Sequence, residues 1–119
     1  TIELVEKDRL KIGTVLQNAA MAERALGKRI ACHFVAAELF LKRCKNQYDL
    51  IFCDPPFPYK FHQQIAETLS AKNLLKPGGL FLMHYPRELN LPEHTGSLAR
   101  CDRREYGRSI VDFFQKETI

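Results

Sequence analysis

The four cysteines of the chain show none of the short paired spacings that build zinc sites or redox-active dithiols. They stand at positions 32, 44, 53 and 101, and we expect buried free thiols, with Cys32 and Cys53 inside strands. A membrane-length apolar stretch and a signal-peptide pattern are also missing, so the expected setting is a reducing cytoplasm. Internal repeats, low-complexity segments and long linkers are absent too, and residues 1–119 are expected to form one domain.

The composition is that of a folded soluble protein and excludes a disordered chain. Of the 119 residues, 45% are hydrophobic and 27% are charged, which is enough apolar material for a modest core. Lysine and arginine number 18 against 14 acidic residues, which gives a net charge of +4. Such a balance favours a polyanionic partner without requiring one.

Short apolar runs alternate with helical patterns along the first 85 residues. Strand patterns cover residues 2–6, 29–35, 48–53 and 80–85. Helical patterns lie between them: the first runs from a cap at Asp8 to a stop at Gly27, and another ends at Lys76-Pro77-Gly78-Gly79. Residues 98–105 and 109–114 form a predicted closing hairpin. This alternation predicts an α/β fold with a mostly parallel sheet that is covered on both faces.

The tetrapeptide Asp54-Pro55-Pro56-Phe57 follows the apolar strand pattern 48–53. Two prolines forbid that strand to continue, and ligands of open α/β sheets bind at the carboxyl ends of strands. The Asp54 carboxylate and a proline carbonyl suit the two hydrogens of an exocyclic amine, while Phe57 suits stacking on a base. The alternative is an ordinary turn that ends a strand.

Four segments together resemble S-adenosylmethionine-dependent methyltransferases. The most similar subfamily is the RsmD type, which modifies the exocyclic amine of a guanine in small-subunit ribosomal RNA. The resemblance implies a Rossmann-like sheet of seven strands with the last one reversed, and the closing hairpin would supply the final two. It also implies S-adenosylmethionine as the cofactor. The segments are Leu4-Val5-Glu6, Asp54-Pro55-Pro56-Phe57, Leu75-Lys76-Pro77-Gly78-Gly79 and Arg104-Glu105-Tyr106-Gly107-Arg108.

The chain departs from the family pattern at its beginning. Family members start with a strand and a glycine-rich turn that wraps the methionine part of the cofactor, whereas the six glycines here lie at positions 13, 27, 78, 79, 96 and 107. The chain therefore resembles a carboxyl-terminal portion that lacks the first strand. We expect a gap in the sheet beside strand 48–53, filled by a swapped strand or removed by rearrangement. Methyl transfer is not expected from these residues alone.

The resemblance also assigns residues to the cofactor. Glu6 would hold the ribose hydroxyls, with Lys7 beside the adenosine and Asp54 near the reacting end. Ala36-Ala37 stand where the family usually has an aspartate for the adenine amine, so a backbone carbonyl or Glu38 would take that part. Without the resemblance, Glu6 could equally be a solvated loop acid or a helix-capping residue.

Two basic and aromatic clusters are candidates for RNA contact. The first follows the proline turn, where an aromatic ring and a basic side chain would meet a flipped nucleotide. Alternatively, Phe61 packs inward and its neighbours form a solvent-exposed helix start. The second lies on the closing hairpin and suits phosphate contact and stacking, although charged hairpin edges also prevent aggregation. The clusters are Tyr59, Lys60 and His62, and Arg100, Arg103, Arg104, Tyr106 and Arg108.

Metal chemistry is not predicted. His33 and His84 lie in expected strands with no Asp, Cys or His at a matching spacing, which favours packed neutral histidines. The leading hypothesis is methyl transfer to a guanine amine of small-subunit ribosomal RNA. The alternatives are an adenine-amine methyltransferase acting on DNA or RNA, and a noncatalytic module that binds RNA or pairs with another subunit through a sheet edge.

Overall fold

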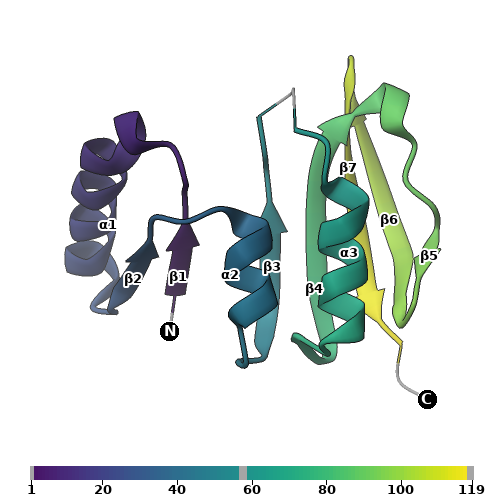
Figure 1. Ribbon diagram of the computed structural model, residues 1–119, viewed down its shortest axis with the longest axis horizontal. Helices are drawn as coiled ribbons and strands as arrows, with labels where there is room; N and C mark the ends of the chain where they lie inside the picture. The colour runs from purple at the N-terminus through teal and green to yellow at the C-terminus, as the bar shows by residue number, and fades with distance from the viewer. Residues whose placement is uncertain (1, 57–58, 118–119) are drawn as a thin grey trace. The chain divides into compact units, whose positions relative to one another are not determined.

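The computed structural model describes residues 2–56 and 59–117, which form two compact units. The first unit covers Thr1–Arg43 and the second covers Cys44–Ile119. Figure 1 colours the elements of both units along the chain, from purple at the N-terminus to yellow at the C-terminus. No helix among the described residues is long and apolar enough to cross a membrane.

The first unit is a βαβ crossover followed by a short helix. Its elements are β1 (Ile2–Val5), the 3₁₀ helix η1 (Arg9–Lys11), α1 (Ile12–Leu26), β2 (Ile30–His33) and α2 (Ala37–Arg43). β1 and β2 pair in parallel, with Ile2 opposite Ile30. The Asp8 side chain accepts a hydrogen bond from the Leu10 amide at 3.0 Å, and Gly27 ends α1 with a left-handed φ of 64°. Both predicted boundaries of this helical segment are therefore confirmed.

The second unit is a five-stranded sheet with one long helix. Its elements are β3 (Tyr48–Cys53), α3 (His62–Ala71), β4 (Leu75–Pro86), the 3₁₀ helix η2 (Arg87–Leu89), β5 (His94–Thr95), β6 (Leu98–Tyr106) and β7 (Ser109–Lys116). The strand order is β3-β4-β7-β6-β5. β3 and β4 are parallel, whereas the contacts β4–β7, β7–β6 and β6–β5 are antiparallel.

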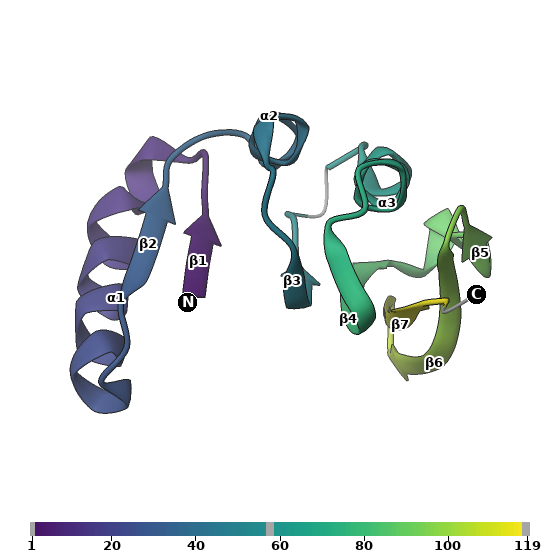
Figure 2. The same cartoon turned by 90° about the horizontal axis from the view of Figure 1, so that it is seen from below.

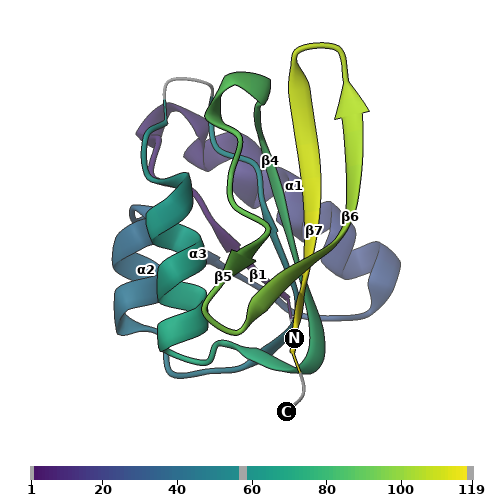
Figure 3. The same cartoon turned by 90° about the vertical axis from the view of Figure 1, so that its right-hand side faces the viewer.

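The α/β class and the reversed strand are confirmed, but the predicted predominance of parallel contacts is wrong for this sheet. β7 is the reversed strand and lies between β4 and β6, so it turns both of its contacts antiparallel. Figure 3 shows β6 and β7 side by side as the closing hairpin that the sequence predicts. Gly107 begins the tight connection with a φ of 60°, a value that residues with a side chain rarely adopt.

The core of the second unit lies between α3 and one face of the sheet. Phe81 of β4 stacks on Phe114 of β7 with ring centroids 5.8 Å apart, and both are buried. Figure 2 shows α3 on one side of β3 and β4. On the other side of β3, Leu50 and Phe52 are 60% and 58% exposed. Within this unit the described helix α3 covers one face only, so the expectation of two covered faces is not met there.

The described strands form two separate sheets, β1-β2 and β3-β4-β7-β6-β5, which agrees with the predicted interruption beside β3. β3 pairs along one edge with β4, and β1 pairs along one edge with β2. Whether another chain supplies a swapped strand stays a prediction.

β4 begins earlier than the sequence suggests. The predicted turn at residues 76–79 belongs to the strand, which starts at Leu75 and contains a register irregularity opposite Tyr48 and Leu50. Gly79 explains the difference, because a Cβ there would lie 2.9 Å from the Lys76 carbonyl oxygen and 3.2 Å from that of Asp49. The backbone turns tightly on itself between Lys76 and Gly79 and also runs close to β3, and glycine permits the strand to continue there.

The cysteines are all free, but only Cys44 is buried. Cys32 and Cys53 lie in β2 and β3 as predicted, yet they are only partly buried, and Cys101 is exposed on β6. The expectation of buried thiols is thus wrong for three of the four residues. β6 contains a register irregularity next to Cys101, between Arg100 and Asp102.

Candidate active site

The proline turn begins directly at the carboxyl end of β3. β3 ends at Cys53, and Pro55 and Pro56 carry no amide hydrogen with which to continue the ladder. The Pro56 carbonyl already accepts the Tyr59 amide at 3.0 Å, which favours the Pro55 carbonyl as the acceptor for a ligand. Phe57, the predicted stacking residue, lies outside the described residues.

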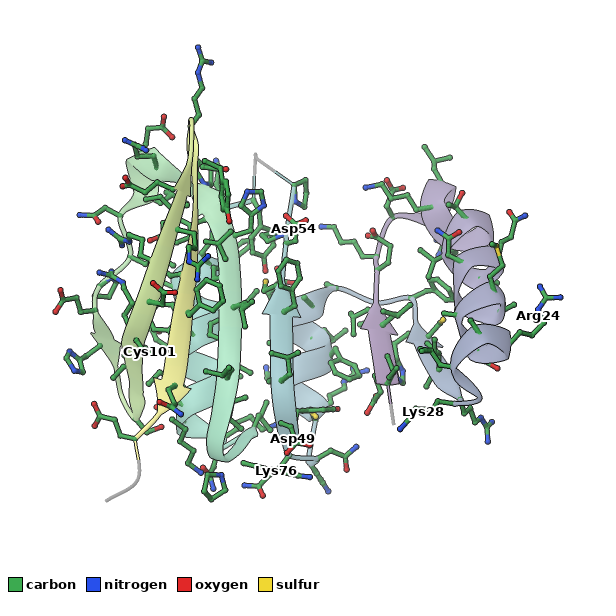
Figure 4. The ribbon with its side chains drawn as sticks, turned by 180° about the vertical axis from the view of Figure 1, so that it is seen from behind. Arg24, Lys28, Asp49, Asp54, Lys76 and Cys101 are labelled. Carbon is green, nitrogen blue, oxygen red and sulfur yellow. The ribbon has the colours of Figure 1, made fainter. Side chains whose placement is uncertain are left out.

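Asp54 stands open to solvent and is held by a histidine. Its side chain is 55% exposed, and its Oδ1 lies 2.8 Å from Nδ1 of His84, whose side chain is 29% exposed. The parallel register sets Cys53 opposite Met83, so the residues that follow them, Asp54 and His84, lie beside each other. Figure 4 shows Asp54 at one end of β3 and Asp49 at the other. The carboxylate is paired on one oxygen but is not sealed off by protein atoms.

The contact with His84 is a feature that the sequence analysis missed. We expected a packed histidine at position 84, whereas the residue is partly exposed and bonded to the candidate catalytic acid. A signal was present in the sequence, because aligning the strand patterns 48–53 and 80–85 in parallel brings Asp54 and His84 together at the same edge.

Behind the proline turn lies a cluster of aromatic rings. The Tyr59 ring lies 5.5 Å from that of Phe61 and 5.2 Å from that of His62, both edge-on. His62 is only 2% exposed, and neither ring nitrogen has a hydrogen-bond partner among the described residues. Burial disfavours the charged imidazolium and lowers the pKa of His62 below its usual 6.5. The ring is therefore a neutral packing group.

This arrangement corrects two sequence expectations. His62 is not available to RNA, and Phe61, expected inward in the alternative, is 47% exposed. The helical period explains why His62 and not Phe61 faces inward, because His62 lies on the same buried face of α3 as the residues three, four and seven positions later. Those residues are Ile65, Ala66 and Leu69.

A buried carboxylate ties the hairpin to β4. Asp112 is fully buried and accepts hydrogen bonds from Nε of Arg103 at 2.7 Å and from the Tyr85 hydroxyl. Nε of Arg100 lies 3.3 Å from the same carboxylate. The hydrogen bond to Asp112 raises the pKa of Arg103, and burial, followed by the bond to Asp112, raises the pKa of Tyr85 to about 12.

Arg100 and Arg103 were expected to contact RNA, and the structure gives them another partner. A carboxylate withdrawn from water requires paired charges and hydrogen-bond donors; Arg103 supplies both, and Arg100 supplies a second positive charge. They are only 15% and 26% exposed. Neither is therefore part of an open cationic surface.

The other predicted RNA contacts of the second unit lie at the surface. Tyr106 is 60% exposed beside the hairpin turn, and Arg108 in the turn is exposed. Lys60, in the segment that leads from the proline turn to α3, is exposed as well. Arg104 is exposed, pairs with Asp102 at 3.1 Å and lies 5.8 Å over the ring of Phe113.

The first unit carries the residues assigned to the cofactor. Glu6 follows β1, and its side chain is 31% exposed; one oxygen accepts the Asp8 amide at 3.1 Å, and the other lies 3.9 Å from Nζ of Lys11. A partly exposed carboxylate at a parallel strand's carboxyl end fits a ribose diol. Lys7 is exposed. Ala36 precedes α2 and accepts the Phe40 amide at 3.0 Å, and Ala37 begins the helix.

Two further features bear on the site. A shallow hollow of about 230 Å³ lies beside Gly78, Arg100 and Lys116, at the amino end of β4 and so away from Asp54. The described residues contain no group of three or more His, Cys, Asp or Glu side chains suited to hold a metal ion.

Comparison with known proteins assigns the chain to a family. The family described as "Conserved hypothetical protein 95" matches residues 1–115. The chain belongs to this family. The family is that of the RsmD-type methyltransferases, so the predicted relationship is confirmed. No curated protein matches the chain significantly.

Solved structures confirm the fold. A conserved hypothetical protein from Streptococcus pyogenes is 27% identical with a TM-score of 0.86, and the match covers 97% of this chain and 71% of that one. A candidate methyltransferase from Escherichia coli is 20% identical with a TM-score of 0.83, covering 97% and 63%. A candidate methylase from Haemophilus influenzae is 21% identical with a TM-score of 0.81, covering 99% and 73%. This chain thus spans less than two thirds of the Escherichia coli protein, and its fold is that of the S-adenosylmethionine-dependent methyltransferases.

Proposed function

We propose that the protein containing this chain transfers a methyl group from S-adenosylmethionine to the exocyclic amine of a guanine in small-subunit ribosomal RNA. The observation that carries the proposal is the Asp54 carboxylate, which stands 55% exposed at the carboxyl end of β3 immediately before two prolines. Family membership supports the reaction class, and the turn supports an amine as the acceptor. Residues 1–119 form part of a single catalytic domain in this proposal.

Asp54 and the proline carbonyls orient the acceptor. The nitrogen lone pair of a guanine amine is delocalised into the ring, so the amine is a poor nucleophile until both hydrogens are held by acceptors. Asp54 accepts one hydrogen and the Pro55 carbonyl accepts the other, while Phe57 stacks on the base. The amine then loses one proton, which passes to the Asp54 carboxylate or to water.

Glu6 is the residue proposed to hold the cofactor's ribose, with Lys7 beside it and the backbone at Ala36-Ala37 next to the adenine. S-adenosylmethionine supplies a methyl group on a positively charged sulfur, and S-adenosylhomocysteine is the other product. The electrophile brings its own charge, so the proposed chemistry assigns no part to a metal ion. The partly exposed Glu6 carboxylate supports this assignment.

The RNA surface of the proposal consists of four exposed side chains and one half-buried ring, that of Tyr59, in the second unit. Cations contact phosphates and aromatic rings stack on unpaired bases, which is how proteins recognise single-stranded RNA. The residues are Tyr59, Lys60, Arg104, Tyr106 and Arg108. The proposed setting is the cytoplasm, which suits the four free thiols.

The test is transfer of a radiolabelled methyl group to small-subunit RNA by the full-length protein. Asp54→Ala should lower the rate by about 10²- to 10³-fold, because one preorganised interaction with the transition state is lost. Asp49→Ala is the matched control, since Asp49 lies on the same strand at its opposite end, 84% exposed. Unchanged transfer by the Asp54 variant would refute the proposal, and transfer to adenine amines only would change the substrate class.

A second candidate function rests on the exposed face of β3. Leu50 and Phe52 are 60% and 58% exposed on a strand that pairs along one edge with β4. A noncatalytic module that joins another subunit through this strand would leave such residues uncovered in the isolated chain. Calorimetry separates the two functions: micromolar binding of S-adenosylmethionine by the chain would argue against the noncatalytic module.

A further inference from the structure

The proposed function leaves one close contact of the candidate site without a role, the one between His84 and Asp54. We propose that His84 is a positioning residue: its Nδ1–H donates to Oδ1 of Asp54 and leaves Oδ2 as the oxygen that accepts the substrate amine. This inference rests on the proposed function, because it assigns His84 to the same reaction. It is independent of the family pattern, since it derives from the 2.8 Å contact in this chain.

The direction of the hydrogen bond follows from the chemistry of the two groups. An ionised carboxylate has no hydrogen to donate, so the hydrogen shared by Asp54 and His84 must sit on Nδ1. A neutral imidazole carries one N–H, and placing it on Nδ1 leaves Nε2 as an acceptor. The contact therefore specifies a tautomer, and the tautomer is measurable.

The backbone around His84 is fixed on both sides. His84 pairs with Val111 of β7, and its strand neighbour Met83 pairs with Cys53 of β3. The side chain is 29% exposed, whereas that of Asp54 is 55% exposed. The better-held partner is thus the histidine, which sits on a central strand and anchors the carboxylate at the sheet's edge.

Holding one oxygen of Asp54 decides how the two amine hydrogens are shared. With one lone pair of Oδ1 engaged by His84, Oδ2 is the more open oxygen of the carboxylate, and a second acceptor beside it is better placed for the other hydrogen. The Pro55 carbonyl follows Asp54 directly, whereas the Pro56 carbonyl already accepts the Tyr59 amide. An unanchored Asp54 would present either oxygen in many orientations, and the in-line geometry of transfer would be populated less often.

Substitutions at position 84 separate the hydrogen bond from the bulk of the ring. The amide nitrogen of asparagine can take the place of Nδ1, whereas that of glutamine reaches toward Nε2. His84→Gln and His84→Leu should lower kcat by about 10- to 100-fold with little change in KM for the cofactor, as expected when an orienting partner is lost. His84→Asn should restore most of the rate. His94→Gln is the control, because His94 lies on β5 with its side chain 65% exposed.

The outcomes distinguish this inference from the proposed function. A wild-type protein that methylates no RNA refutes the proposed function. Transfer that depends on Asp54 but is equal in all His84 variants, or equally reduced in all of them, refutes the positioning role alone.

Nitrogen-15 spectra of the wild-type chain test the contact without any activity. They should show a hydrogen on Nδ1 of His84, and Asp54→Ala should move that resonance. A hydrogen on Nε2 alone would overturn the inference whatever the enzyme does.

Discussion

Replacing Asp112 with alanine should destabilise the second unit more than any surface change. The carboxylate is fully buried and receives hydrogen bonds from Arg103 and Tyr85, with Arg100 at 3.3 Å. Removing it leaves the Tyr85 hydroxyl, on a residue only 1% exposed, without this acceptor. It also leaves two guanidinium groups facing a site that has lost its negative charge.

The magnitude follows from what remains buried. Breaking a buried ion pair by removing one partner costs about 3–5 kcal/mol, because the other charge stays uncompensated. Arg103 is 26% exposed and can recover part of its hydration, which favours the lower end of that range. Asp49→Ala removes a surface pair with Lys76 at 3.4 Å, and such pairs contribute about 0–1 kcal/mol.

Urea unfolding followed by tyrosine fluorescence measures the difference, since the chain has four tyrosines and no tryptophan. A slope of about 1–1.5 kcal/mol per molar urea converts a loss of about 3 kcal/mol into a midpoint lower by about 2–3 M. Asp49→Ala should move the midpoint by less than about 1 M. Equal midpoints for the two variants would refute the reasoning, because they would mean that the buried cluster is worth no more than a surface pair.

Two further predictions concern packing. The folded state holds His62 neutral with a lowered pKa, while the unfolded chain takes up a proton below about pH 6.5, so stability should fall as the pH drops through that value and His62→Leu should remove this dependence. An equal change in melting temperature between pH 7.5 and 5 for the wild type and for His62→Leu would contradict this prediction. Gly79→Ala should cost about 1–3 kcal/mol, because its Cβ would meet the Lys76 carbonyl at 2.9 Å. Gly13→Ala in α1, with nothing within 4 Å, should instead be neutral or stabilising by up to about 1 kcal/mol, and equal unfolding midpoints for the two glycine variants would count against the close-approach argument.

Local patterns in the sequence predict most of the elements. The strand at residues 48–53 has the predicted boundaries, and the helix stop at Gly27 needs only the preference of a left-handed position for glycine. The start of β4 at Leu75 could not be predicted in this way. It depends on the tight backbone at Gly79, where a Cβ would meet the Lys76 carbonyl of the same segment at 2.9 Å and the Asp49 carbonyl of β3 at 3.2 Å.

The residues of the candidate site also differ in whether local sequence predicts their place. Asp54 is predictable because the prolines that follow mark the strand end. Arg103 is not, since an arginine in a charged hairpin carries no local sign that its partner is a buried aspartate on the facing strand. His62 is predictable in principle: the neighbouring Tyr59 and Lys60 suggest a surface, but the helical period of residues 62, 65, 66 and 69 places it inward.

β4 connects the buried cluster to the candidate site through two consecutive residues. Side chains alternate along a strand, so His84 points to the face of Asp54 while Tyr85 points into the core toward Asp112. A strand whose core-facing side chain is fixed by a buried carboxylate has little freedom to move its next residue. The cluster that stabilises the second unit therefore also holds the histidine that orients Asp54, and loss of Asp112 should weaken the His84 contact even where the fold survives.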